Sequence, residues 1–525
     1  MTKGIIIFVI VTTIVLTGCV NQPIAPSPPD HPDETAPIST TVPSKGKTDL
    51  VRTAGPRELP ARLLGLQAVP LYEHLIDDPT KVAIAKEMSP AFVRFPGGMV
   101  GNYYNWRSGH LELDVRPDSS ATYRFYANLA EQVRKLHPQG VFIEQYHQFS
   151  QEIGAEIVLL VNLETSSIPD QVAWFKSMRD QGVLPRYIEL GNEFWLAMLG
   201  DPNVLRKWPD APTSMRVMKE YRDSLQPYVF PGTKFAVQAA ASRFNASVVD
   251  GKLVYPASLK RWDEALRPEP WFDAVTIHMY PAVERIVGTE MKAALPEGMD
   301  RVFPSLMARC DQGVDEAIAA IEKQLGGKEI WITEFSGSFP GIANLSDPTT
   351  PILGLNIHLT TRMLMKFLEH PSVTMALYHM LNFSGGPLSL FRRDIKSNTY
   401  IPIGSAIILK WFNEAANGGA VYRKLTVNGA RLINSGVTAE ESYYDIEALE
   451  LQKGDTTTVI IHNASPEAKK LTLAGFISGK SPARIESSQV IPTEDYLKAA
   501  PSVRIIPASD EVEIPPYSVS RIIWQ

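Results

Sequence analysis

The central part of the chain alternates short, almost wholly apolar runs with longer amphipathic stretches. Eight runs rich in β-branched and aromatic residues are predicted strands: 63–67, 92–95, 156–162, 187–190, 234–239, 274–278, 330–335 and 374–378. Between them the apolar residues recur with helical spacing, for example over 170–181, 214–225, 313–325 and 357–368. Strands that alternate with helices in this way indicate an α/β fold with a parallel sheet.

Eight strand–helix units favour a (β/α)₈ TIM barrel, which we expect over residues 61–414. A doubly wound sheet is the alternative, but such a sheet usually has a glycine-rich phosphate-binding turn after its first strand, and none is present here. The long connections 97–139, 195–213 and 281–312 follow the second, fourth and sixth strands. Loops after barrel strands lie at the C-terminal face, so these segments predict a shaped substrate cleft there.

The pattern changes after a predicted helix at 403–414. Short strands then follow one another with turn residues between them: 420–424, 430–435, 443–450, 456–462, 470–473, 489–492, 503–506 and 518–524. This succession is typical of an antiparallel β-sandwich, which we expect over residues 415–525. Residues 48–60 precede the barrel as a lead-in and are a candidate additional strand of this sandwich.

The N-terminus has an apolar run behind Lys3 that is too short to span a bilayer and is typical of a secretory signal. The segment 16–19, Leu-Thr-Gly-Cys, resembles the lipobox of bacterial lipoproteins. The resemblance implies a signal peptide over 1–18, lipidation of Cys19, and a lipid-anchored protein at the membrane of the bacterial cell envelope. An ordinary signal peptide is the alternative. Residues 19–47 contain seven prolines and no aromatic residue, which predicts a disordered tether.

Composition narrows the class of partner. The chain of 525 residues has a formal net charge of −6 and no long cluster of lysine and arginine, so nothing indicates a nucleic-acid partner. Two cysteines, Cys19 and Cys310, are too few for a disulfide framework or a cysteine-rich metal site. With Cys19 acylated, Cys310 is expected to be a small core residue. The histidines and carboxylates show no metal-site spacing, and we expect no metal and no cofactor.

Two predicted barrel strands lead into a glutamate. Strand 187–190 continues as Gly-Asn-Glu to Glu193, and Glu334 lies near the end of strand 330–335. Three strand–helix units separate them, which predicts that they face each other across the barrel mouth. Such a pair can cleave an acetal, because one carboxylic acid protonates the leaving oxygen while the other, ionised, attacks the sugar carbon.

This arrangement resembles glycoside hydrolase clan A, which contains retaining barrel glycosidases of the arabinofuranosidase, xylosidase and glucuronidase types. The resemblance covers about residues 61–410. It implies that Glu193 is the acid/base, that Glu334 is the nucleophile, and that Asn192 binds the sugar hydroxyl next to the anomeric carbon. Arg94, in the segment Phe-Val-Arg-Phe-Pro-Gly-Gly, matches an arginine that keeps the nucleophile of the clan ionised.

Further residues match the clan or depart from it. The sixth strand ends in His278 and Tyr280, which the resemblance places beside the nucleophile. Many clan members have a tryptophan platform after the eighth strand, where this chain has Tyr378 and His379, and either of these residues is a candidate substitute. Glu189 is expected to be a structural partner for an arginine inside the barrel. Other candidate substrate contacts are Asn162, Trp106 and Trp195.

The expected function is a surface-anchored retaining glycoside hydrolase that acts on an oligosaccharide, polysaccharide or other glycoside by double displacement. A non-catalytic carbohydrate-binding lipoprotein on the same barrel is one alternative, although it would not need both glutamates. A transglycosylase is another, because an acceptor sugar need only outcompete water. A barrel scaffold whose sandwich binds a protein partner is a third, but the sandwich has no unusually apolar run.

Overall fold

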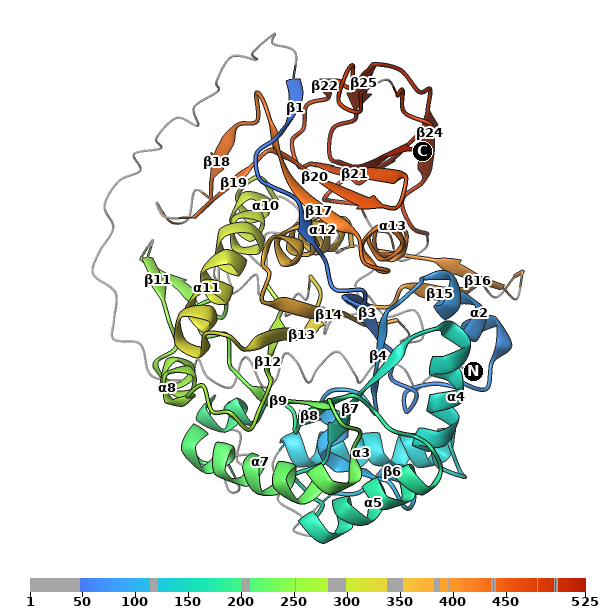
Figure 1. Ribbon diagram of the computed structural model, residues 1–525, viewed down its shortest axis with the longest axis vertical. Coiled ribbons are helices and arrows are strands. Elements are labelled where there is room, and N and C mark those ends of the chain that lie inside the picture. Colours follow the sequence, from blue (N-terminus) through green and yellow to red (C-terminus); the bar gives the residue numbers. More distant parts are fainter. Residues whose placement is uncertain are drawn as a thin grey trace.

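The computed structural model describes residues 48–113, 121–199, 208–250, 252–281, 299–337, 353–381, 388–394, 396–397, 399–435, 438, 441–478, 480–494, 496 and 499–525. The predicted signal peptide, the tether and Cys19 lie outside these residues. Within these ranges, no helix combines the length and the apolar character that crossing a bilayer requires. The chain forms a barrel followed by a β-sandwich, and the predicted fold class is confirmed (Figure 1).

Eight parallel strands close the barrel in the order β3-β4-β7-β8-β9-β12-β13-β14 (Figure 1). They are β3 Leu64–Gln67, β4 Phe92–Phe95, β7 Glu156–Val161, β8 Tyr187–Leu190, β9 Lys234–Gln238, β12 Ala274–Met279, β13 Glu329–Phe335 and β14 Val373–His379. Apolar side chains from several strands, among them Phe92, Trp331 and Leu377, pack together inside the barrel. This packing fills the interior and leaves the carboxyl ends of the strands to carry polar groups.

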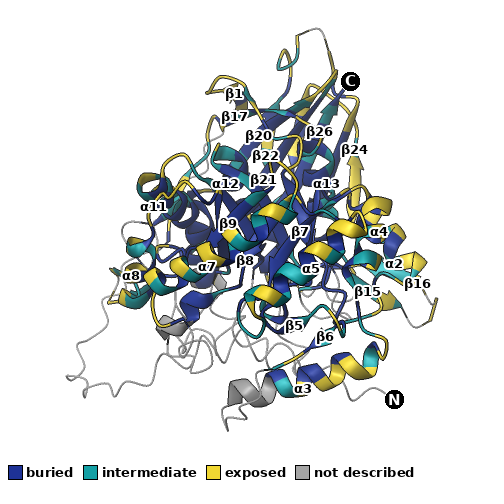
Figure 2. Ribbon diagram, turned by 60° about the horizontal axis from the view of Figure 1, so that its bottom comes forward, coloured by how far each residue is buried: buried dark blue, intermediate teal, exposed yellow. Residues whose placement is uncertain are grey.

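Helices surround the barrel, and most of them bury one face (Figure 2). They are α2 Pro79–Glu87, α3 Ala121–Leu136, α4 Ile143–Ile153, α5 Ile168–Asp180, α7 Ala211–Leu225, α8 Ala257–Ala265, α10 Met299–Ala308, α11 Val314–Leu325, α12 Leu353–Glu369 and α13 Ala406–Ala416. In α7, buried residues recur every three or four positions, as Met218, Tyr221 and Leu225 do. Asp210 caps this helix by accepting a 2.7 Å hydrogen bond from the backbone N–H of Thr213.

Shorter elements lie in the connections. They are the 3₁₀ helices η1 Met99–Tyr103, η2 Phe194–Leu199 and η3 Gln226–Tyr228, the π-helical turn η4 Arg309–Gly313, and the paired strands β5 Tyr104–Asn105 with β6 His110–Leu111, β10 Ser247–Val249 with β11 Lys252–Val254, and β15 Phe391–Asp394 with β16 Thr399–Pro402. Cys310 lies in η4, where it is buried, in agreement with the expected core residue. η1 and η2 follow β4 and β8 directly and form part of the barrel mouth.

The sandwich is a ten-stranded sheet in which β24-β23-β26-β21-β20-β17-β1-β22-β25 follow one another and β2 pairs with β17. Its strands are β1 Thr48–Arg52, β2 Arg57–Glu58, β17 Val421–Val427, β20 Ile446–Lys453, β21 Thr456–Asn463, β22 Lys469–Thr472, β23 Arg484–Gln489, β24 Val503–Ile506, β25 Glu511–Ile514 and β26 Ser518–Trp524. The hairpin of β18 Leu432–Asn434 and β19 Ser442–Tyr444 is separate. β1 pairs antiparallel with β17 and parallel with β22, and so joins the two parts of the sheet.

Both faces of the central strand β21 are buried. Val459 and Ile461 of β21 belong to the core of the sandwich. Ile460, between them, packs instead with the large core of the barrel and its helices. Neighbouring residues of a strand point to opposite faces, so a strand that is buried on both faces needs consecutive apolar residues. In β21 these residues attach the sandwich to the barrel.

Two predicted strands of the sandwich are wrong in position. β23 covers Arg484–Gln489 and not 489–492, because three of its four buried residues, Glu486, Ser487 and Ser488, are polar and weaken the apolar signal of a strand. Ser487 accepts a 2.8 Å hydrogen bond from the Ser520 hydroxyl, for example. The predicted strand 443–450 is interrupted at the buried Asp445, which accepts hydrogen bonds from the backbone and side chain of Arg431. β25 was not predicted.

Candidate active site

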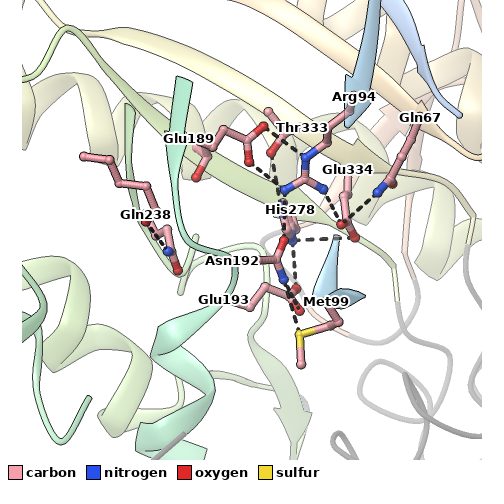
Figure 3. A network of polar contacts seen from close by, with 12 residues as sticks. Gln67, Arg94, Met99, Glu189, Asn192, Glu193, Gln238, His278, Thr333 and Glu334 are labelled. Atoms are coloured by element: carbon pink, nitrogen blue, oxygen red, sulfur yellow. Dashed lines mark hydrogen bonds and ion pairs between the residues drawn. The ribbon is translucent and has the colours of Figure 1, made fainter. Parts of the chain in front are cut away.

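The two predicted glutamates meet at the mouth of the barrel (Figure 3). Glu193 follows β8, and Glu334 lies in β13, three strands further around the barrel. One carboxylate oxygen of each glutamate and a ring nitrogen of His278 all lie within 4.8 Å of one another. Glu334 is 6% exposed, whereas Glu193 is partly exposed. The barrel therefore places a buried carboxylate beside one that solvent and ligands can reach.

Arg94, fully buried at the carboxyl half of β4, links the carboxylates of the site. Its guanidinium donates to both oxygens of Glu189 at 3.0 and 2.6 Å. Nη1 donates to Glu334 Oε1 at 2.6 Å, and Nη2 donates to Asn192 Oδ1 at 2.9 Å. Burial alone would lower the pKa of Arg94, but Glu189 and Glu334 outweigh burial and raise it. The guanidinium stays charged, and the expected pairing of Glu189 with an arginine is confirmed.

Glu334 is held in its ionised form. Burial alone would raise the pKa of its carboxyl group, but the positive charges of His278 and Arg94 and a hydrogen bond from Tyr280 outweigh burial. The Tyr280 hydroxyl donates to Glu334 Oε2 at 2.5 Å. The pKa of Glu334 therefore lies well below its usual range. His379, 3.7 Å away, adds charge only in acid, because burial lowers its own pKa to about 4.

His278 connects the two glutamates. Its Nδ1 lies 2.8 Å from Glu193 Oε1 and 3.7 Å from Glu334 Oε2, and its Nε2 lies 3.2 Å from the Thr333 hydroxyl. Burial alone would lower the pKa of His278, but Glu334 and Glu193 outweigh burial and raise it. The imidazole therefore hydrogen-bonds Glu193 through one ring nitrogen and the Thr333 hydroxyl through the other, and these two contacts fix its orientation.

Several site residues escaped the sequence analysis. The Gln67 amide contacts Glu334 and His379, and Met99 Sδ accepts a hydrogen bond from Asn192 Nδ2 at 3.3 Å. Gln67 and Gln238 each end an otherwise apolar barrel strand, which is the same signal that identified the glutamates. The sequence gives no sign that Met99 belongs to the site, because an apolar residue after a strand is expected to belong to the core.

Tyr378 is not in the mouth of the barrel, contrary to the prediction. It is 1% exposed, and its ring packs edge-to-face on Phe335 at a centroid distance of 5.7 Å. The neighbouring residue Leu377 belongs to the cluster inside the barrel, so Tyr378 points outward toward the helices. His379 points back inward and approaches Glu334, so of the two candidate substitutes it is the one that lies in the mouth of the barrel.

Three predicted substrate contacts lie among packed or hydrogen-bonded groups. Trp106 stacks on Trp174 at an interplanar angle of 11° and donates to Asp170 at 3.2 Å. Trp195 is 7% exposed in η2. The Asn162 amide donates to the Tyr104 carbonyl at 3.0 Å, and its oxygen accepts from two backbone N–H groups of the following loop. In the described chain, no hydrogen bond joins any of the three to the two glutamates.

Glu193, His278 and Glu334 could together supply three metal ligands, because their oxygen and nitrogen atoms lie so close. The surroundings do not suit a cation. Arg94 brings a permanent positive charge to within 2.6 Å of Glu334, and Tyr280 donates to the other oxygen of that carboxylate. The site is better suited to hydrogen-bonded carboxylates than to a bound metal ion.

Comparisons with known proteins show a likeness of fold. No family model and no curated protein matches the chain. The GH51 arabinofuranosidase from Xanthomonas axonopodis pv. citri is 13% identical with a TM-score of 0.61, over 91% of this chain and 100% of that one. The family 51 α-L-arabinofuranosidase AbfB from Bifidobacterium longum is 14% identical with a TM-score of 0.62, over 92% and 100%. CelM2, a bifunctional glucanase-xylanase from a metagenome library, is 12% identical with a TM-score of 0.53, over 91% and 98%.

Proposed function

We propose that the protein is a retaining glycoside hydrolase that cleaves O-glycosidic bonds by double displacement. The main support is the separation of Glu193 and Glu334, which have one carboxylate oxygen each within 4.8 Å. Retaining glycosidases hold the two carboxyl groups ~5–5.5 Å apart, whereas inverting enzymes need ~6.5–9.5 Å to admit a water molecule. The titles of the solved structures that share the fold name arabinofuranosidases and a glucanase-xylanase, which supports a carbohydrate substrate.

In the proposed first step, Glu334 attacks the anomeric carbon while Glu193 protonates the departing oxygen. Arg94 and Tyr280 keep the attacking carboxylate ionised and correctly oriented. In the second step Glu193 takes a proton from water, and the water hydrolyses the glycosyl-enzyme. Asn192 is held by Arg94 through its oxygen. Its amide nitrogen donates to Met99 Sδ at 3.3 Å and to Glu193 Oε2 at 3.4 Å, and would exchange one of these contacts for the neighbouring sugar hydroxyl.

Removal of the nucleophile tests the proposal. Glu334→Ala and Glu334→Gly should each lose at least about 10³-fold in kcat, because no other group can form the glycosyl-enzyme. The rate is measured on a panel of aryl glycosides that differ in sugar and anomeric configuration, with NMR of the first product to establish retention. Hydrolysis at the wild-type rate by either variant would refute the assignment, as would an inverted product.

The acid role of Glu193 has its own signature. Glu193→Ala should lose about 10²–10⁴-fold on glycosides with a basic leaving group, and much less on aryl glycosides whose leaving group needs no proton. An equal loss on both classes would count against the role. A mechanism-based inactivator that labels Glu334 would distinguish the enzyme from a silent binding protein, and product analysis with an added acceptor sugar would reveal a transglycosylase.

We further propose that the enzyme is exported and anchored to the membrane by a lipid on Cys19. The support is the lipobox-like segment 16–19 and the proline-rich segment behind it. Metabolic labelling with a radioactive fatty acid should mark the wild-type protein and leave Cys19→Ala unlabelled. Equal labelling of both proteins, or of neither, would contradict the anchor.

A further inference from the structure

The turn that carries Glu193 has an unusual backbone. Gly191 has a φ of 77° and Glu193 a φ of 51°, so both adopt the left-handed conformation. Glycine adopts it freely, but a residue with a β-carbon is disfavoured there. A glutamate in this conformation persists when its surroundings hold it in place. The turn therefore depends on groups outside itself.

Asn102, in η1, supplies one such group. Its Oδ1 accepts a hydrogen bond from the backbone N–H of Asn192 at 3.0 Å, and its Nδ2 donates to the backbone carbonyl of Asn192 at 2.9 Å. The side chain thus pairs with both polar backbone groups of the residue immediately before Glu193. Asn102 is 1% exposed, so water does not compete for these bonds.

Gln238, at the end of β9, holds the turn from the other side. Its Oε1 accepts from the backbone N–H of Phe194 at 2.6 Å, and its Nε2 donates to the backbone carbonyl of Leu190 at 2.8 Å. It is 3% exposed. The side-chain amides of Asn102 and Gln238 therefore hold the backbone before, within and after the turn. This turn places the Glu193 carboxylate 2.8 Å from His278.

We propose that Asn102 is a positioning residue for the acid/base Glu193, with Gln238 as a second anchor of the same turn. The inference rests on the proposed function. Asn102 acts through the backbone of Asn192 and contacts neither the carboxylate of Glu193 nor that of Glu334 through a hydrogen bond in the described structure. Without its two bonds the turn relaxes toward ordinary backbone angles, and the Glu193 carboxylate leaves its place beside the scissile oxygen.

Asn417 offers a matched control. Its side-chain amide makes the same pair of bonds to a single backbone residue, because Oδ1 accepts from the N–H of Leu64 and Nδ2 donates to the Leu64 carbonyl, both at 2.9 Å. Leu64 begins β3, at the end of the barrel away from the mouth. Replacing either asparagine by aspartate puts an oxygen against a carbonyl oxygen without changing the shape of the side chain.

The experiment compares Asn102→Asp with Asn417→Asp in the full chain. On an alkyl or sugar leaving group, Asn102→Asp should lower kcat by about 10²-fold with little change in KM, because misplacement by about 1 Å costs that much. On a dinitrophenyl glycoside of the same sugar the loss should be within a few fold. Asn102→Ala, which adds no charge, and Gln238→Glu should show the same dependence on the leaving group.

Asn417→Asp should lower the melting temperature yet retain the wild-type ratio of the two rates. If the ratio in Asn102→Asp and Asn102→Ala equals that in Asn417→Asp, Asn102 is merely structural and the inference is overturned. A wild-type enzyme without activity on any glycoside of the panel would refute the proposed function itself, and the inference with it.

Discussion

Tyr280 shows how a single neutral group sets the state of the proposed nucleophile. Its hydroxyl donates to Glu334 Oε2, while Arg94 occupies the other oxygen. A hydrogen bond donated to a carboxylate favours the ionised form. The phenol is itself kept protonated, because burial first and the nearby charge of Glu334 second raise its pKa well above the usual value. The Tyr280 hydroxyl therefore keeps its proton, and so remains a hydrogen-bond donor, at neutral and acidic pH.

Tyr280→Phe should move the acidic limb of the pH profile of kcat/KM to higher pH. The pKa of Glu334 rises when the donor is lost, so the carboxylate takes up a proton earlier as the pH falls. A charge-assisted hydrogen bond is worth about 1.5–3 kcal/mol, so the loss at the acidic end should exceed the loss at neutral pH by about ten-fold or more. Tyr444→Phe, at an exposed strand position, is the control and should leave the profile unchanged.

The sequence alone predicts those site residues whose charged side chains lie at the end of an apolar strand. Glu193 and Glu334 stand out in this way. Arg94 and His278 are identified through the resemblance to the clan, and the structure brings all four residues together. Asn102 could not be found, because it pairs with a backbone that folds against it only in three dimensions. The prediction placed Tyr378 in the barrel mouth, but its ring points outward. Neighbouring residues of a strand point to opposite sides, so the direction of this side chain depends on the register of the eighth strand.

At the scale of the element, the segment between β4 and η1 passes close to the Glu334 carboxylate at Gly98. A β-carbon on Gly98 would lie 2.1 Å from Glu334 Oε1, the oxygen that accepts from Arg94. The tight turn after the second barrel strand therefore reflects the space that the carboxylate occupies, as well as the backbone geometry. The segment at Gly98 and the Glu334 carboxylate therefore limit each other's position.

Gly98→Ala should displace the Glu334 carboxylate from Arg94 and lower kcat by about 10²-fold or more, as a 1 Å misplacement does. Steady-state kinetics and thermal melting together would show a catalytic loss larger than the loss of stability suggests. Gly55→Ala is the matched control, because a β-carbon there meets nothing within 4 Å. A kcat of Gly98→Ala close to that of the wild type would show that the segment between β4 and η1 can move away from Glu334.

The elements themselves differ in how far sequence could predict them. Barrel strands such as β7 are buried on both faces and so are apolar throughout, which makes them easy to recognise. β23 is buried as well, but Ser487 and Ser488 fill its interior positions, and its pairing depends on partners from β26. The predicted boundaries followed apolar content, and they failed where polar pairs replace it.

At the scale of the whole molecule, barrel and sandwich share a buried polar interface. Arg362 of α12 forms ion pairs with Asp311 of η4 and Glu447 of β20. Beside it, His358 of α12 lies 2.7 Å from His462 of β21, and its other nitrogen lies 2.7 Å from the Val490 carbonyl. When both histidines are neutral, the N–H of His462 can donate to His358 and the N–H of His358 can donate to Val490. A proton added to the His358 nitrogen that faces His462 would place two N–H groups against each other.

The stability of the protein should therefore rise with pH between about 4 and 6.5. Burial lowers the pKa of His358 to about 4 and that of His462 well below its usual value. The unfolded chain, in which histidine titrates near 6.5, binds more protons in this window, so acid favours unfolding. The slope is up to about 1.4 kcal/mol per pH unit for each histidine. Denaturant unfolding from pH 4.5 to 7.5 measures it.

His358→Gln should flatten this dependence, because a glutamine keeps a donor and an acceptor without a proton to gain. The matched control is His147→Gln, a partly exposed histidine on α4 whose ring contacts Gln151, and this variant should retain the wild-type slope. Parallel slopes for wild type and His358→Gln would show that the acid sensitivity arises elsewhere in the protein.

The pairing of β1 with β17 and β22 determines the order in which the chain can complete its fold during synthesis. Leu50 lies opposite Val427, and Thr48 opposite Leu471, so the first strand of the sandwich cannot pair until partners from the far part of the chain have been synthesised. Contacts so distant in sequence form slowly. A shortened chain that starts at the barrel would leave two open strand edges in the sandwich, a template for aggregation. Recombinant work on this protein should therefore retain residues 48–52.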